Sequence, residues 1–243
     1  VEQVLEIKSG IEQTTQGRFR DSSAVHILVA WHEIQTESGL GYNSIDAINA
    51  CIEALNDDYL PHNIFFTLDT VNRVVNDNWF NNWYDIHVDG MVELNYDPYH
   101  YLNIYTADLL SAGVQGFAYL GNQFASSHPQ QSVNLDHDRI NSTWVVTHEV
   151  GHHLGLPHTF QGDCSEPNDG IDDTPQHNES GLWSCNSSQD TCPNDPGNDP
   201  VTNYMNYSGS CQNEYTVGQV EWQHYMTENY HPGYLENNFN YPA

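Results

Sequence analysis

Three of the four histidines within one short segment constrain the fold of this chain more than any other feature. Residues 148–158 read HEVGHHLGLPH, in which His148 and His152 are one helical turn apart. Side chains at positions i and i+4 of a helix project from the same face about 6 Å apart, so both imidazoles can bind one zinc ion. Gly155 allows the chain to turn sharply, and His158 then supplies a third nitrogen.

Three protein ligands leave one coordination position open to water, which is typical of a catalytic rather than a structural zinc site. Glu149 is adjacent to the first ligand, where its carboxylate can contact a zinc-bound water. His153 points to another face of the helix, and we interpret it as a residue that packs or that supports the ligands, rather than as a ligand. The pattern that includes Gly155 and His158 is far more specific than H-E-x-x-H alone. The sequence therefore predicts a catalytic zinc site.

The charge of the chain excludes two classes of partner. Its 243 residues include 33 acidic and 5 basic side chains, for a formal net charge of −28. Binding to nucleic acid needs a basic patch that neutralises phosphates, and anionic membrane surfaces repel so acidic a chain. We therefore expect no nucleic-acid partner and no membrane partner. The hydrophobic fraction of 38% is sufficient for a folded core.

Four of the five cysteines lie in a segment rich in Asp, Asn, Pro and Gly. An even number of cysteines in such a segment is typical of two disulfides formed in an oxidising compartment, so we expect a secreted, extracellular protein. The spacing alone does not choose among the possible pairings of Cys164, Cys185, Cys192 and Cys211. Cys51 shares a helical apolar stripe with its neighbours and is expected to be a buried free thiol.

The hydrophobic pattern predicts strands and helices before His158 and mostly loops after it. Strands are expected at residues 24–34, 64–68, 101–105, 115–119 and 132–135. Gly116 interrupts the fourth of these strands, which indicates a sheet edge or a close backbone approach. Residues 71–97 are rich in Asn and Trp and alternate weakly.

Three helices are expected. The first begins at Ser44 and ends before Pro61, and the second runs from Asn141 or Ser142 to about Leu154. The third covers about residues 216–228. Its inner face is expected to carry Val217, Val220 and Tyr225.

The segment 148–158 resembles the H-E-x-x-H-x-x-G-x-x-H signature of metzincin metalloproteases. These proteases also have a methionine turn, and NYMNY at 203–207 fits it, with Met205 beneath the zinc. Thr159 after the third histidine, DDTP at 172–175, DTCP at 190–193 and YTVGQ at 215–219 resemble the pappalysins, ulilysin-type members most closely. The resemblance is dense from about 148 to 219 and looser from 25 to 120.

The resemblance implies an α+β metzincin fold, with a twisted five-stranded sheet and two long helices above a zinc cleft. The lower subdomain is then irregular, disulfide-bonded and ends in a helix. We divide the chain into an N-terminal extension or pro-segment remnant (1–22), an upper catalytic subdomain (23–158) and a lower catalytic subdomain (159–243). The family pattern pairs Cys164 with Cys192 and Cys185 with Cys211.

Family members also bind calcium in the lower subdomain. In this chain the acidic cluster at 163–173 supplies hard oxygen ligands at short spacing, which suit calcium. The candidate calcium ligands are Asp169, Asp172, Asp173 and Thr174. A solvated acidic loop without an ion is the alternative.

The predicted function is that of a secreted zinc metalloendopeptidase acting on protein or peptide substrates. Glu149 is the predicted general base toward the zinc-bound water. Tyr207, two residues after Met205, is predicted to hydrogen-bond the oxyanion in the transition state, with simple packing as its alternative role. Two rival hypotheses are a binding module with a structural zinc and a zinc hydrolase acting on a non-peptide substrate.

Overall fold

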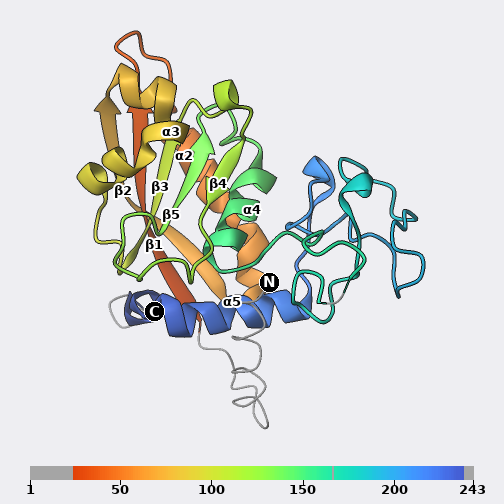
Figure 1. The fold of residues 1–243 in the computed structure, drawn as a ribbon. Helices are drawn as coiled ribbons and strands as arrows, with labels where there is room; N and C mark the ends of the chain where they lie inside the picture. Colours follow the sequence, from red (N-terminus) through yellow and green to blue (C-terminus); the bar gives the residue numbers. More distant parts are fainter. Residues whose placement is uncertain (1–23, 166, 238–243) are drawn as a thin grey trace. The chain divides into compact units, whose positions relative to one another are not determined.

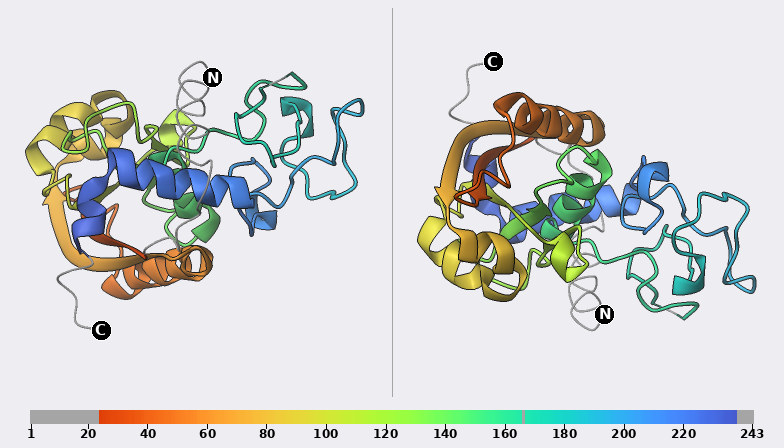
Figure 2. Two further views of the ribbon diagram at one scale, coloured as in Figure 1. Left: turned by 90° about the horizontal axis from the view of Figure 1, so that it is seen from below. Right: turned by 90° about the horizontal axis from the view of Figure 1, so that it is seen from above.

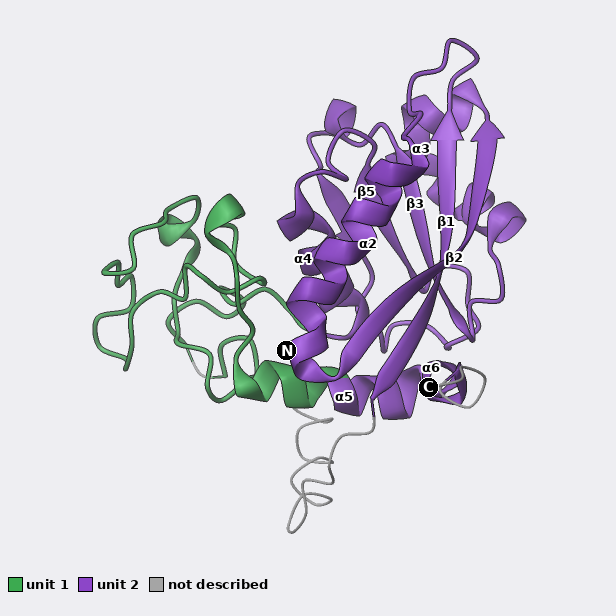
Figure 3. Cartoon of the chain, turned by 180° about the vertical axis from the view of Figure 1, so that it is seen from behind, with its two compact units in different colours: residues 1–23, 156–223 green, residues 24–155, 224–243 purple. Residues whose placement is uncertain are grey.

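The computed structural model describes residues 24–165 and 167–237 (Figure 1). These residues form two compact units, of which unit 2 holds residues 24–155 and 224–237 and unit 1 holds residues 156–223 (Figure 3). The predicted extension at residues 1–22 lies outside the described residues. Residues from 224 onward group with unit 2, whereas the sequence-based division assigns them to the lower subdomain; a boundary at His158 stays a prediction.

Unit 2 is built on a mixed sheet of five strands in the order β2-β1-β3-β5-β4. The strands are β1 (Val25–Gln35), β2 (Ile64–Val75), β3 (Tyr101–Ala107), β4 (Gly116–Ala118) and β5 (Ser132–Asp136). All neighbours pair in parallel except β4, which runs antiparallel to β5 at one edge. The five predicted strands are confirmed, although β2 continues to Val75 and β4 is only three residues long.

Helices cover both faces of this sheet. Helices α2 (Ile45–Tyr59) and α4 (Thr143–His153) pack against each other on one face, and α3 (Asp77–Leu94) lies on the opposite face (Figure 2). The predicted start of α2 is confirmed, because the Ser44 side chain accepts a hydrogen bond of 3.2 Å from the backbone N–H of Ala47. The predicted helix around residues 142–154 is likewise confirmed as α4.

Helix α3 is the main element that the sequence analysis missed. Asn76 caps it by accepting a hydrogen bond from Trp79, and Phe80, Trp83 and Met91 bury its inner face against the sheet. Its Asn, Asp and aromatic residues have modest helix propensity, and Asn82 interrupts the regular backbone with φ −128°. Tertiary packing of the inner face therefore stabilises a helix that its local sequence does not favour.

Unit 1 contains little regular secondary structure. Its described residues include two 3-10 turns, Glu179–Gly181 and Gly209–Cys211, and the first part of α5 (Val217–Tyr230). The disulfides Cys164–Cys192 and Cys185–Cys211 confirm the pairing expected from the family, and Cys51 in unit 2 is a buried free thiol as predicted.

The predicted last helix is present as α5, but its predicted inner face is wrong at one end. Val217 is 70% exposed, whereas Trp222 and Met226 are buried. Val217 is aliphatic, but it lies in the first turn of α5, where a side chain has few neighbours to pack against. A short helix that it did not predict, α6 (Pro232–Glu236), follows α5.

Among the described residues, no helix is long and apolar enough to cross a bilayer.

The packing of α3 gives a test of this fold. A Cβ atom at Gly90 would lie 2.3 Å from Cζ3 of the fully buried Trp83 indole. We expect Gly90→Ala to lower the free energy of unfolding by about 1–3 kcal/mol, because overpacking outweighs the better helix propensity of alanine. Urea denaturation followed by circular dichroism measures this.

The neighbouring Asp89→Ala is the matched control, since Asp89 is exposed and gains helix propensity without a clash. An unfolding free energy of Gly90→Ala equal to that of the wild type would contradict the described packing of Trp83.

Candidate metal centre and active site

Helix α4 brings the first two predicted ligands together. The Nε2 atoms of His148 and His152 are 3.1 Å apart, and the two rings stand at 89° to each other. Two nitrogens that bind one tetrahedral zinc at about 2.0–2.1 Å lie about 3.3 Å apart. The observed pair therefore fits two adjacent ligands of one zinc ion.

The third predicted ligand follows directly after the helix. Gly155 has φ +88°, a conformation that favours glycine, and the chain turns there toward His158. The ligand nitrogens of His148, His152 and His158 all lie within 4.8 Å of one another. Three imidazole nitrogens at such distances suit zinc, so the residues present fit the ion.

Glu149 occupies a tight and buried position beside the first ligand. Only 6% of its surface is exposed, and burial raises the pKa of its carboxyl group to about 8. A metal cation held beside it acts in the opposite direction by favouring the carboxylate form. A Cβ atom at Gly116 of β4 would lie 2.8 Å from Glu149 Cγ, so the glycine leaves the space that this side chain needs.

In unit 1, hydrogen bonds connect Thr159, the residue after the third histidine, to the methionine turn at Met205. The backbone N–H of Thr159 donates a hydrogen bond of 3.1 Å to the carbonyl of Met205, and the Met205 side chain is fully buried. The Thr159 hydroxyl is 2.8 Å from Nε2 of His177, whose pKa is lowered by burial. These contacts fix the backbone next to His158 to the turn that carries Met205 and Tyr207.

Tyr207 lies beside a predicted zinc ligand. Its ring centroid is 4.6 Å from that of His158 in a T-shaped arrangement, and 5.0 Å from that of Phe160. The side chain is half-buried. This position is compatible with both roles considered for Tyr207, a hydrogen bond to substrate and packing, so its catalytic role stays a proposal.

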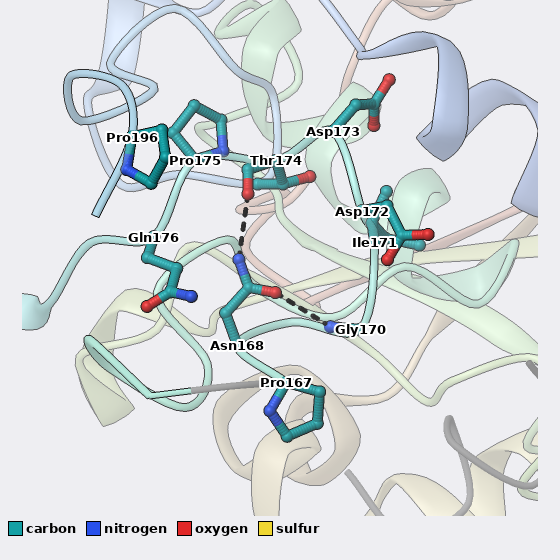
Figure 4. Close-up of a pocket in the computed structure, with 10 residues that line it drawn as sticks. All are labelled: Pro167, Asn168, Gly170, Ile171, Asp172, Asp173, Thr174, Pro175, Gln176 and Pro196. Carbon is teal, nitrogen blue, oxygen red and sulfur yellow. Dashed lines mark hydrogen bonds between the residues drawn. The ribbon is translucent and has the colours of Figure 1, made fainter.

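Three of the four candidate calcium ligands, Asp172, Asp173 and Thr174, line one pocket. A pocket of about 260 Å³ is lined by residues 167–168, 170–176 and 196 (Figure 4). Asp169 and Thr174 are buried, and burial raises the pKa of Asp169 to about 7. The carboxylate of Asp173 also accepts hydrogen bonds from the Thr216 hydroxyl and from the backbone N–H of Gly218, at the start of α5.

His153 is a packing residue, as predicted. It is fully buried in unit 2, with Nε2 2.9 Å from the hydroxyl of Tyr234 and its ring 4.5 Å from that of His231. Burial lowers its pKa well below the usual range, so it is neutral. It therefore stabilises the end of α4 without contributing a ligand atom to the zinc site.

The family model described as Pregnancy-associated plasma protein-A matches residues 85–228, which include the histidine motif and the methionine turn. The chain belongs to the pappalysin family. It is therefore a zinc metallopeptidase of the metzincin type, and the resemblance inferred from its motifs is confirmed.

Similar proteins agree with this assignment. This pappalysin is 35% identical over 209 residues to an extracellular metalloprotease of Pyricularia oryzae, covering 80% of this chain and 70% of the relative. It is 32% identical over 223 residues to an extracellular metalloprotease of Neurospora crassa, covering 84% and 75%. Its fold is similar to that of a variant of Tannerella forsythia promirolysin, with a TM-score of 0.77 and 22% identity over 96% of this chain and 91% of the other. It is also similar to mirolysin in complex with a compound, with a TM-score of 0.75 and 22% identity over 91% of this chain and 100% of the other.

The structure of this pappalysin adds site residues that the sequence analysis did not assign. Gly116 was expected to mark a sheet edge or a close backbone approach. It lies at the edge, but the group nearest to its Cβ position is the Glu149 side chain, which was not foreseen. The hydrogen-bonded pair of Thr159 and His177, and the stacking of Trp183 on Tyr207, had no sequence signal. Each of these pairs joins residues that are distant in the sequence.

The contact between Gly116 of β4 and Glu149 of α4 predicts that a larger residue at position 116 lowers the activity. We expect Gly116→Ala to lower kcat of peptide hydrolysis about 10- to 100-fold, because the added methyl group displaces the carboxylate of Glu149 from its position. Bound zinc should stay stoichiometric, since none of the three histidines moves. Steady-state kinetics and metal analysis by mass spectrometry measure both quantities.

The strand variant Ala118→Gly serves as the control for a general loosening of β4. Full activity of a zinc-loaded Gly116→Ala variant would show that Glu149 does not depend on the space that Gly116 leaves.

Proposed function

We propose that this pappalysin is a secreted endopeptidase in which Glu149 acts as general base and Tyr207 stabilises the transition state. The observation that carries the proposal is the buried Glu149 carboxylate next to His148 on α4. A structural zinc site needs no such group. Burying a carboxylate costs free energy unless a charged partner compensates, and such costly groups concentrate at functional sites. This argues against a binding module.

A zinc ion held by His148, His152 and His158 would polarise the scissile carbonyl and make water a stronger nucleophile near neutral pH. Glu149 then takes one proton from the attacking water as the carbon–oxygen bond forms. It delivers that proton to the leaving amine as the carbon–nitrogen bond breaks, so no net proton is gained or lost.

Tyr207 contributes at the carbonyl oxygen of the scissile bond. Its position beside His158 supports a hydroxyl that donates a hydrogen bond to this oxygen as negative charge develops. Such a bond is stronger in the transition state than with bound substrate. The hydroxyl therefore acts mainly on kcat rather than on substrate affinity.

The edge of the sheet supports a peptide substrate over a small non-peptide one. Strand β4 (Gly116–Ala118) pairs with β5 on one side and ends the sheet on the other, and Gly116 lies against Glu149. An extended peptide can add to such an edge through main-chain hydrogen bonds, which place a peptide bond next to the base.

Secretion is part of the same proposal. Two disulfides in unit 1 are typical of an oxidising compartment, and the curated relatives are named extracellular metalloproteases. We also hypothesise that a pro-segment ends near Arg18 and Arg20, which lie outside the described residues, and that cleavage beside one of them releases the mature enzyme.

We expect Glu149→Ala to keep its fold and its zinc while kcat falls about 10³-fold, because the variant loses the proton acceptor alone. A chelator should abolish the activity of the wild type, and added zinc should restore it. Mass-spectrometric mapping of cleaved peptides, with zinc content measured in parallel, tests the proposal.

Glu53→Ala is the control, because Glu53 is an exposed carboxylate on α2. Near-normal peptide hydrolysis by zinc-loaded Glu149→Ala would overturn the role of the base. Cleavage of no peptide by the zinc-loaded wild type would overturn the endopeptidase itself.

We also propose that calcium binds near Asp169 and Thr174. Asp169 Oδ2 and Thr174 Oγ1 are buried and have no hydrogen-bond partner among the described residues, which supports an oxygen-liganded cation there. Asp172 and Asp173 line the pocket with Thr174 and stay predicted ligands, although Asp173 also accepts hydrogen bonds at the start of α5.

At constant zinc, calcium should raise the melting temperature of the wild type at pH 8, because an ion that binds only the folded state stabilises it. Asp169→Asn should melt higher than the wild type in calcium-free buffer, since it removes a buried carboxylate charge, and should not respond to calcium. Scanning calorimetry measures both effects. A melting temperature of the wild type that is independent of calcium would contradict the proposed site.

A further inference from the structure

Trp183 in unit 1 combines two unusual properties. Its side chain is 67% exposed, although tryptophan usually buries most of its large apolar surface. Its backbone has φ +63°, a left-handed conformation that is an outlier for a bulky residue. Backbone strain of this kind persists only where the surrounding structure enforces it, and it concentrates at functional sites.

The contacts of Trp183 show what its conformation achieves. Its backbone N–H donates a hydrogen bond of 2.8 Å to the carbonyl of Tyr207, and its indole stacks on the Tyr207 ring at 5.5 Å and 27°. Main chain and side chain of Trp183 therefore both contact the same residue. Stacked aromatic pairs gain energy beyond the area that they bury, so the indole restricts the rotation of the phenol ring.

The segment that carries Trp183 is held at both ends. On one side, Gly181 is buried, and its carbonyl accepts a hydrogen bond of 2.7 Å from the Gln189 side chain. On the other side, Cys185 is joined to Cys211, four residues after Tyr207. Trp183 therefore contacts Tyr207 from a loop that is restrained at both ends. Its exposure does not mean that this loop is mobile.

Tyr207 connects this loop to the predicted zinc ligand. Its ring contacts Trp183, His158 and Phe160, and His158 in turn stacks on Phe160 at 4.7 Å and 9°. The orientation of the Tyr207 hydroxyl relative to His158 follows from the contacts on its ring. Among these contacts, Trp183 is the most exposed, so removing its side chain disturbs the buried structure least.

We propose that Trp183 is a positioning residue that holds the ring of Tyr207, and with it the hydroxyl, in the orientation needed at the scissile carbonyl. The inference rests on the role proposed for Tyr207 above. It assigns the strained backbone and exposed indole of Trp183 to preorganisation of that hydroxyl, which lowers the reorganisation needed during the reaction.

A double-mutant cycle tests this proposal. Tyr207→Phe removes the hydroxyl but keeps the ring, and should lower kcat about 10- to 100-fold with little change in KM. Trp183→Ala should lower kcat about 5- to 20-fold, and Trp183→Phe, which retains an aromatic ring, should recover most of the loss. In the Tyr207→Phe background, Trp183→Ala should cost less than about twofold, because the hydroxyl it positions is already absent.

Val217→Ala is the control, because Val217 is an equally exposed apolar residue of unit 1. A loss of kcat of the same size in both backgrounds would overturn the positioning role, since Trp183 would then act independently of the Tyr207 hydroxyl. An increase in KM alone would overturn it as well and would indicate direct contact with the substrate.

A readout without activity separates this inference from the proposed function. In the metal-free protein labelled with 3-fluorotyrosine, the resonance missing from Tyr207→Phe belongs to Tyr207. The indole ring current should shift this resonance, and Trp183→Ala should move it toward the position of an exposed tyrosine. An unmoved resonance overturns the inference even if the enzyme cleaves peptides, whereas a moved resonance in an enzyme that cleaves none overturns only the endopeptidase proposal.

Discussion

The period of one buried helix sets the geometry on which the rest of this structure depends. One turn of α4 places His148 and His152 side by side and puts Glu149 next to the first of them. Such spacing is useful only if the helix cannot rotate or shift. The layers of unit 2 provide that restraint, because α4 packs between α2 and the β4–β5 edge of the sheet.

Polar contacts between α4 and α2 fix the orientation of the two helices. The hydroxyl of Thr147 in α4 donates a hydrogen bond of 2.6 Å to the carboxylate of Asp58 in α2, and the Tyr59 hydroxyl lies 3.4 Å from the Thr147 carbonyl. Hydrophobic burial alone is non-directional, whereas hydrogen bonds fix the rotation of one helix against the other. The positions of His148 and His152 therefore depend on the interface between α4 and α2.

Burial of Glu149 links the fold to the chemistry. Desolvation raises the pKa of this carboxyl group, while a cation at the neighbouring histidines favours its charged form. The acid–base behaviour of Glu149 therefore depends on the ion, and Gly116 keeps the space in which the carboxylate can face it.

Unit 1 has little regular secondary structure, so other interactions must hold its loops in place. Two disulfides and side-chain hydrogen bonds, such as those from Thr191 and Gln189 to Asp199, hold its loops in place.

The local pattern of the sequence determined much of this protein. Strand periods, the Ser44 cap, the eleven-residue histidine motif and the cysteine-rich loops depend on neighbouring residues, and each predicted its element or its family correctly. Tertiary structure decided the rest. Helix α3 forms because Trp83 packs against the sheet, and Val217 is exposed although its residue type favours burial. The contacts of Gly116 with Glu149 and of Trp183 with Tyr207 join residues distant in the chain, so only the folded backbone brings them together.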